Sequence, residues 1–308
     1  MYFKDNIEAL GHTPLVELAQ LSPSKRVRIL AKMEGQSVGG SGSIKDRIAK
    51  YMIEQAEKSG QLTQDKTIIE ATSGNTGIAL AWLGRRKGYR VTIVMPDSMS
   101  LERRKLLRIF GAELVLTDGA LGINGAIEKA CELVAKDRKY FMPDQFNNLA
   151  NPRAHYETTG VEILADFPYE RISVLVCGIG TGGSICGISR RLREKYPDIK
   201  LVGVEPYPDD PIQGLRCLDG IQIPPIVDLS LITERVKVSS RAAASATRQL
   251  LNREGIFAGL SSGAAVHQAI KIASEMDEGN IVVVLPDGGW KYLSLDCWAE
   301  AGGEVSNR

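Results

Sequence analysis

The chain has 308 residues, of which 44% are hydrophobic and 24% charged, and its formal net charge at pH 7 is +1. This balance argues against a surface built mainly for nucleic acids, and no apolar run approaches the roughly 20 residues that span a bilayer. The five cysteines show no C-x-x-C spacing and the three histidines lie far apart, so we expect neither a disulfide framework nor a metal site. The first residues lack an apolar signal core, which favours a cytoplasmic protein.

Short runs rich in Val, Ile and Leu alternate with segments whose apolar residues recur at helical spacing. The runs predict strands at 28–34, 66–70, 90–95, 113–117, 140–142, 172–177, 201–205 and 281–285. The spacing predicts helices at 45–59, 78–87, 101–110, 123–135, 156–165, 185–195, 242–253 and 264–275. Segment 206–231 is rich in proline and is expected to be a long irregular loop.

This alternation predicts an α/β fold with mostly parallel twisted sheets flanked by helices. The strands are too many for one small sheet, so we expect two sheets in two domains with a cleft between them. Ligands in such folds bind beyond the carboxyl ends of the strands. The glycine-rich loops of this sequence fall at those ends.

The segment S-G-S-I-K-D-R, residues 41–47, places Lys45 where a loop becomes a helix. The helix macrodipole disfavours a cation at that end, so the amine tends toward its neutral, nucleophilic form. The pattern supports the hypothesis that Lys45 forms a Schiff base with pyridoxal phosphate (PLP). A solvated lysine in a first helical turn is the alternative.

The segment T-S-G-N-T-G, residues 72–77, lies between a predicted strand and a predicted helix. Its hydroxyls, free N–H groups and helix N-terminus form an anion site that suits a carboxylate. Helix caps and turns use the same residue types. Six of them in a row exceed what capping requires, which favours a ligand loop.

The segment G-I-G-T-G-G-S, residues 178–184, also follows a strand and precedes a helix. Gly178, Gly180 and Gly183 satisfy G-x-G-x-x-G, and Glu205 ends the next strand where a ribose-binding acid would lie. A dinucleotide-binding dehydrogenase is therefore one interpretation. A phosphate monoester would use the same N–H groups and helix dipole, so the loop indicates a phosphate without specifying its bearer.

A third loop, G-L-S-S-G at 259–263, precedes another helix. Ser262 there is a plausible helix cap. A functional interpretation is a neutral hydroxyl aimed at a buried ligand atom.

Four longer segments carry a resemblance to a known family: E-A-T-S-G-N-T-G-I-A-L-A (70–81), M-P-D-S-M-S-L-E-R-R (95–104), D-Q-F-N-N-L-A-N-P-R-A-H-Y-E-T-T-G-V-E-I (144–163) and G-I-F-A-G-L-S-S-G-A-A (255–265). With the loops above they resemble the fold-type II PLP enzymes, which include tryptophan synthase β, and within them the cysteine synthases of the B type. G-L-R-C-L-D (214–219) and G-G-W-K-Y-L-S (288–294) resemble the branch that uses O-phosphoserine.

The resemblance implies a PLP site between the two domains. Lys45 matches the Schiff-base lysine and catalytic base, Asn75 the residue that bonds the PLP 3-hydroxyl, and Ser261 the serine at the pyridine nitrogen. The phosphate loop is matched by Gly180, Thr181, Gly182, Gly183 and Ser184.

The substrate site is carried over in the same way. The positions that match the substrate-binding residues are Thr72, Ser73, Gly74, Thr76 and Gln145. Arg216, in the proline-rich segment, is a candidate for binding a phosphate leaving group. A surface arginine is the alternative.

The activity implied is β-replacement through an aminoacrylate, which makes L-cysteine from O-phospho-L-serine or O-acetyl-L-serine and a sulfide-type donor. The resemblance also implies a homodimer, a smaller domain at 38–147, a larger one formed by 1–37 with 148–308, and a sulfur-carrier protein as a candidate partner.

Other functions remain open at this point. One is replacement with another nucleophile, as in cystathionine β-synthase or diaminopropionate synthase. A dehydrogenase leaves Lys45 and the 72–77 loop unexplained. The intact Lys45 and Ser261 argue against a catalytically idle regulatory homologue.

The sequence departs from the family before the lysine. The family pattern E-G-x-N-P-x-G-S-x-K-D-R is here E-G-Q-S-V-G-G-S-G-S-I-K-D-R (34–47), two residues longer and without Asn-Pro. We expect this lead-in loop to be more flexible than its counterparts.

Overall fold

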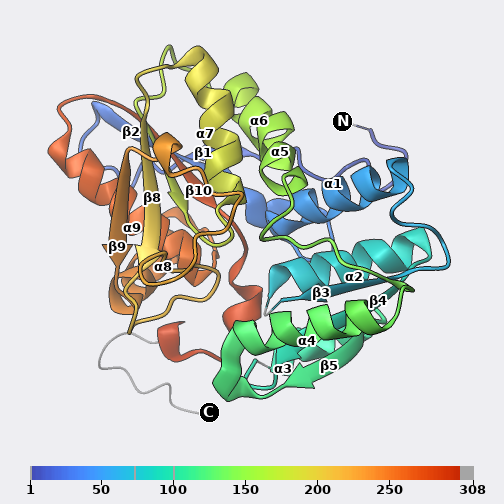
Figure 1. The fold of residues 1–308 in the computed structure, drawn as a ribbon. Coiled ribbons are helices and arrows are strands. Elements are labelled where there is room, and N and C mark those ends of the chain that lie inside the picture. Colours follow the sequence, from blue (N-terminus) through green and yellow to red (C-terminus); the bar gives the residue numbers. More distant parts are fainter. Residues whose placement is uncertain (1, 73, 100, 299–308) are drawn as a thin grey trace.

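The computed structural model describes residues 2–72, 74–99 and 101–298. These residues form two sheets, one with strand order β1-β2-β10-β7-β8-β9 and one with order β5-β4-β3-β6, and helices cover them (Figure 1). The expected α/β fold with two mostly parallel sheets is confirmed. The domain boundaries at 37/38 and 147/148 remain a prediction.

The first sheet consists of β1 (Leu15–Glu17), β2 (Val27–Met33), β10 (Gly279–Leu285), β7 (Val174–Gly178), β8 (Lys200–Pro206) and β9 (Glu234–Val238). Only β1 pairs antiparallel; every other pairing in this sheet is parallel. Because side chains alternate across a strand, Ile29 packs with α8 (Ser240–Glu254) and α9 (Leu260–Glu275). Its neighbour Leu30 packs in the opposite core, which contains residues of α7 (Gly183–Lys195).

The second sheet consists of β5 (Glu113–Thr117), β4 (Arg90–Pro96), β3 (Thr67–Ala71) and β6 (Tyr140–Phe141), all parallel. One face is covered by α1 (Lys45–Lys58), α2 (Asn75–Lys87) and α3 (Leu101–Ile109), and the other by α4 (Gly122–Lys136). Ile68 and Ile69 point to opposite faces, and both are fully buried. Burial on both faces explains why the strands appear in the sequence as continuous apolar runs.

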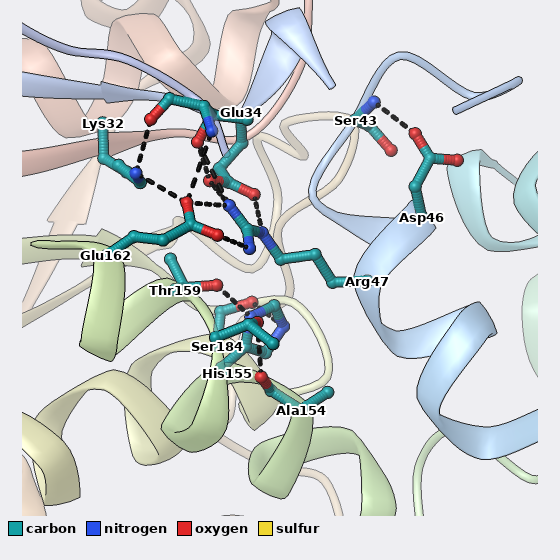
Figure 2. Close-up of polar contacts among 12 residues, drawn as sticks. Lys32, Glu34, Ser43, Asp46, Arg47, Ala154, His155, Thr159, Glu162 and Ser184 are labelled. Atoms are coloured by element: carbon teal, nitrogen blue, oxygen red, sulfur yellow. Dashed lines mark hydrogen bonds and ion pairs between the residues drawn. The ribbon is translucent and has the colours of Figure 1, made fainter. Parts of the chain in front are cut away.

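Helix α1 lies between the two halves, where it packs against both α2 and α5 (Ala150–Glu157). A buried ion cluster also ties it to the six-stranded half. The Arg47 guanidinium binds Glu34, which follows β2, at 2.6 Å. It also binds Glu162 of α6 (Thr159–Asp166), likewise at 2.6 Å (Figure 2). The helix that begins with Lys45 is therefore held from both sides.

The helix predicted at 156–165 is wrong in its extent, because the structure has two helices, α5 and α6, that meet at Thr158. Thr158 has φ −122° and ψ −74°, and its Oγ1 donates to the Ala154 carbonyl at 2.6 Å. A threonine that satisfies the backbone in this way competes with the helix. Pro152 lies in the first turn of α5, where a missing N–H costs nothing.

Strand β9 was not predicted. Its sequence, E-R-V-K-V, is mostly charged and exposed, as expected of an edge strand. The proline-rich segment before it is irregular as predicted, apart from the 3₁₀ turn Leu229–Leu231. The remaining short 3₁₀ turns are Glu34–Gln36, Gly119–Leu121, Gly289–Tyr292 and Asp296–Trp298. None of the described helices combines the length and apolarity needed to cross a membrane.

Candidate functional site

The loops at the carboxyl ends of β3, β7 and β10 meet at two adjoining cavities of about 200 Å³ and about 30 Å³. Predicted site residues that line the larger cavity are Lys45, Thr72, Gly74, Asn75, Thr76, Gln145, Gly180, Thr181, Arg216 and Ser261. Those that line the smaller one are Lys45, Gly180, Thr181, Gly182 and Ser184. Predicted residue Ser73 lies outside the described residues, and Gly183 lies in the same loop without lining either cavity.

Lys45 is the first residue of α1 and lines both cavities. Its backbone N–H donates to Ser43 Oγ at 3.1 Å. Burial lowers the pKa of the Lys45 ammonium, and the surrounding Cys177, Asp287 and Glu34 only partly oppose that shift. The amine is thus favoured in the neutral form that nucleophilic chemistry requires.

The lead-in loop before Lys45 is held by a set of polar contacts. The buried Asp46 carboxylate accepts from the backbone N–H groups of Ser41 at 3.1 Å and Ser43 at 3.2 Å (Figure 2 shows the second). Lys291 Nζ donates to the Ser41 carbonyl at 2.6 Å. These contacts hold the loop backbone, and the expected greater flexibility relative to the family stays a prediction.

The loop after β3 presents a polar wall. Thr76 Oγ1 donates to Gln145 Oε1 at 2.7 Å, and both side chains are buried. Thr72 Oγ1 accepts from the Gly74 N–H at 3.3 Å. Asn75 Nδ2 donates to Asp287 Oδ2 at 2.8 Å, while the buried Asn75 Oδ1 has no partner among the described residues. A buried acceptor without a donor is costly, so this oxygen points to a ligand that donates.

Sequence reasoning missed Asp287 and Tyr292. Asp287 is buried just beyond the end of β10, and its Oδ2 accepts from Tyr292 Oη at 2.8 Å as well as from Asn75. The available signal was its position, since a polar residue directly after a buried parallel strand lies at the ligand-binding edge.

The loop after β7 requires its glycines. Gly182 has φ +87°, which favours glycine, and a Cβ on Gly180 would lie 2.6 Å from the Gly214 carbonyl oxygen. Thr181 Oγ1 accepts from Asn151 Nδ2 at 3.1 Å, and Ser184 Oγ lies 3.0 Å from His155 Nε2. The loop opens onto the smaller cavity at the N-terminus of α7, where backbone N–H groups suit a phosphate.

The structure argues against the role of Glu205 as the ribose-binding acid of a dinucleotide site. Glu205 is buried, its Oε2 accepts from the Leu218 N–H at 3.0 Å, and its Oε1 lies 2.9 Å from Arg235 Nε. Both oxygens are engaged within the protein, so this carboxylate is not available to bind a ribose.

Ser261 and Arg216 line the larger cavity from the six-stranded half. Ser261 is buried in the first turn of α9. The Arg216 guanidinium stacks on Phe146, with its carbon 4.6 Å from the ring centroid, and burial lowers its pKa. Within the described part of the chain no carboxylate forms an ion pair with Arg216.

Comparison with protein families gives a match between residues 7–287 and the model described as "Pyridoxal-phosphate dependent enzyme". The chain belongs to this family. It is 42% identical over 304 residues to a cysteine synthase of Staphylococcus aureus, covering 96% of this chain and 97% of the relative.

Solved structures of such enzymes confirm the fold. An O-ureido-L-serine synthase superposes with a TM-score of 0.92 at 38% identity, covering 99% of this chain and 98% of the other. A cysteine synthase from Entamoeba histolytica has a TM-score of 0.88 at 36% identity, with 99% and 93% covered. The expected PLP dependence is confirmed by the family.

The residues present fit PLP chemically. The Lys45 amine, whose pKa is lowered by burial, suits its aldehyde, the Asn75 Oδ1 that has no partner among the described residues suits its ring hydroxyl, and the N-terminus of α7 suits its phosphate. The residues that carry these groups line two cavities that share Lys45, Gly180 and Thr181.

Proposed function

We propose that the protein is a cysteine synthase that makes L-cysteine from O-phospho-L-serine or O-acetyl-L-serine and a sulfide-type donor. The observation that carries the proposal is the position of Lys45. Lys45 lines both the smaller cavity, at the loop suited to a phosphate, and the larger cavity, which Thr76 and Gln145 line with polar groups suited to a carboxylate. The curated relative and the Entamoeba structure, both named cysteine synthase, support the same activity.

PLP, when bound, supplies an electron sink for the bond changes at Cα and Cβ of the amino acid. In the proposal, Lys45 Nζ would hold its aldehyde, Asn75 Oδ1 would accept from its ring hydroxyl, and residues 180–184 would bind its phosphate. As a free amine, Lys45 would take up the Cα proton of the substrate and later return it. Burial of the ammonium favours the base form that the first transfer needs.

Ser261 is assigned to the ring nitrogen. A hydroxyl is a neutral partner and, unlike a carboxylate, does not stabilise a protonated ring. Less negative charge is then drawn into the ring, which favours loss of the β-substituent over transamination or racemisation.

The substrate carboxylate is assigned to the loop after β3. Thr72, Gly74, Thr76 and Gln145 line the cavity there, and Ser73 belongs to the same assignment from sequence alone. Hydroxyls and N–H groups at the start of α2 would bind it.

Arg216 is assigned to the leaving group. A half-buried guanidinium that lines the cavity without an ion-pair partner suits a phosphate. Arg216→Ala is expected to lower kcat/KM for O-phosphoserine selectively, with O-acetylserine as the matched control. Equal losses with both substrates would remove this assignment.

The nucleophile has a second candidate. The O-ureido-L-serine synthase matches this chain in structure, and its name implies a β-replacement with a nucleophile other than sulfide. Purified holoenzyme supplied with either serine ester and with sulfide, thiosulfate, homocysteine or a hydroxyurea separates these functions. We expect L-cysteine to form fastest. A larger kcat/KM with a non-sulfide nucleophile would replace the proposal.

The proposal extends to a cytoplasmic homodimer with the two domains at 38–147 and at 1–37 with 148–308, and to a sulfur-carrier protein as one donor. The family resemblance supports the homodimer, the two domains and the carrier protein, and the cysteines without C-x-x-C spacing favour the cytoplasm. Light scattering would test the dimer. Turnover with a carrier thiocarboxylate, compared with free sulfide, would test the donor.

A further inference from the structure

His155 lies on α5, is fully buried, and has a hydroxyl at each ring nitrogen. Nδ1 is 3.0 Å from Thr159 Oγ1, and Nε2 is 3.0 Å from Ser184 Oγ (Figure 2). Thr159 is the first residue of α6, and Ser184 lies in the first turn of α7, beside the smaller cavity. The imidazole therefore joins the α5–α6 break to the predicted phosphate loop.

The surroundings of His155 favour the neutral ring. Burial lowers the pKa of His155 well below its ordinary value, and the positive charges of Lys45 and Arg47 lower it further. A neutral imidazole has one donor nitrogen and one acceptor nitrogen. The tautomer therefore sets the direction of both hydroxyl contacts at once.

The two tautomers have opposite consequences for Ser184. If Nε2 accepts, the single hydroxyl hydrogen of Ser184 is used by the ring, and the oxygen offers only lone pairs to the cavity. If Nε2–H donates, Ser184 keeps its hydrogen for an anion in the cavity. Thr159 then donates to Nδ1, and the described residues show no competing side-chain hydrogen bond for its Oγ1.

The contact between Asn151 and Thr181 has the second arrangement, in which a side chain of α5 donates to a hydroxyl of the loop. Asn151 lies four residues before His155, on the same face of α5, and its Nδ2 donates to Thr181 Oγ1 at 3.1 Å. The Gly183 N–H also points to that oxygen, at 3.4 Å. Thr181 thus accepts from within the protein and has its own hydrogen free.

The close contact between α5 and α7 is built for this arrangement. A Cβ on Gly183 would collide with the Asn151 side chain, and a Cβ on Gly187 would collide with α5 at Pro152 and His155. These two glycines, four residues apart on α7, let α5 approach closely enough for its donors to reach the loop hydroxyls.

We propose that His155 is a positioning residue whose Nε2–H donates to Ser184 Oγ, so that the Ser184 hydrogen is directed to the phosphate of PLP, as Asn151 does for Thr181. The inference rests on the proposed function only in placing that phosphate at residues 180–184. It deepens that function by assigning α5 to the orientation of the hydroxyl donors.

The direct test is the tautomer of His155 in the holoenzyme. The sequence contains only three histidines, so protein labelled with ¹⁵N-histidine gives few side-chain signals, and His155→Gln identifies the one of interest. We expect a neutral ring with the hydrogen on Nε2. A ring with the hydrogen on Nδ1, or an imidazolium, would overturn the proposal. The visible absorption of the same sample shows whether PLP is bound, so failure of the cofactor assignment is seen separately.

A second test measures PLP affinity in variants. His155→Leu removes the donor, whereas His155→Gln retains an amide N–H that can reach toward Ser184. We expect His155→Leu and Ser184→Ala each to weaken PLP binding roughly tenfold. The double variant should bind PLP only slightly more weakly than either single variant. His155→Gln should retain most of the native affinity. Additive losses would contradict coupling through the Ser184 hydroxyl. His267→Gln, on α9 and outside both cavities, is the control.

Discussion

The loops after β3 and after β7 share one construction, a buried parallel strand followed by glycine- and hydroxyl-rich residues and a helix N-terminus. They differ in where their polar groups point. In the β7 loop, the hydroxyls of Thr181 and Ser184 face donors or acceptors on α5. In the β3 loop, Thr76 donates to Gln145, and Asn75 Oδ1, beside the larger cavity, has no partner among the described residues.

This difference suits two kinds of ligand, a cofactor that stays bound and a substrate that is exchanged. A loop braced by a helix of its own half is set up before any ligand arrives, which suits a cofactor that stays bound. The polar side chains of Thr76 and Gln145 at the larger cavity suit a carboxylate that is exchanged in every turnover, whereas Asn75 Oδ1 in the same loop is assigned to the cofactor. Lys45 stands between them, on the helix that contacts both halves.

Lys45→Ala removes the group that serves both loops, and we expect the largest effect from it. Turnover should fall by roughly a thousandfold or more, since both the covalent attachment and the base are lost. The visible absorption band should disappear with it. Lys58→Ala, at the far end of α1, is the control. A Lys45→Ala enzyme that keeps the band and turns over within tenfold of the native rate would refute the shared role.

Ser261→Asp alters only the half that anchors the cofactor. We expect β-replacement to slow by roughly a hundredfold, equivalent to about 3 kcal/mol, because a carboxylate at the ring nitrogen would stabilise the protonated ring. Ser261→Ala, which adds no charge, should keep the rate within about tenfold. Unchanged turnover in Ser261→Asp would count against the ring-nitrogen assignment.

Glu162→Gln weakens the ion cluster that holds α1 to the six-stranded half. Burial opposes ionisation of Glu162, but hydrogen bonds and charges from Arg47 and Lys32 outweigh it and lower its pKa to about 2. A carboxylate with a depressed folded-state pKa stabilises the fold fully above its unfolded value near 4.5, and that contribution disappears as pH falls toward 2.

Chemical denaturation across this pH window measures the effect. At neutral pH we expect Glu162→Gln to lose about 3 kcal/mol of unfolding free energy, and to show a smaller further loss than the native protein between about pH 5 and pH 2. Parallel curves for the two proteins would mean that the cluster does not contribute in this way.

Thr76→Val alters only the half assigned to the substrate. It leaves Gln145 Oε1 without its donor, so KM for the amino acid should rise about tenfold, while PLP affinity stays within twofold. The opposite result, weaker PLP binding with an unchanged KM, would contradict the assignment of the substrate to the loop after β3.

The strands were predictable because parallel strands buried on both faces leave continuous apolar runs, and β5 was predicted with its observed bounds. The place of Lys45 at the start of a helix was predictable because helical spacing begins directly after the glycine-rich loop, and its role stays a prediction. The charged edge strand β9 leaves no such run, and the α5–α6 break depends on a threonine hydroxyl that competes with the helix.

The loops that line the cavities were predictable from the sequence, whereas the residues that contact and hold those loops were less so. Asp287 and His155 act through contacts between segments far apart in the chain, such as the 2.8 Å bond from Asn75 to Asp287. Nothing in local spacing marks such pairs. The lead-in loop shows the same limit, since its contacts with Asp46 and Lys291 could not be read from its sequence, and its greater flexibility relative to the family stays a prediction.

The central claim is that Lys45 carries PLP, and one measurement tests it most directly. Purified protein is reduced with borohydride and digested, and the modified peptide is identified by mass. The account predicts that the visible band is lost on reduction and that the PLP adduct lies on Lys45. An adduct on another lysine, such as the nearby buried Lys291, or colourless protein that retains NAD, would contradict it.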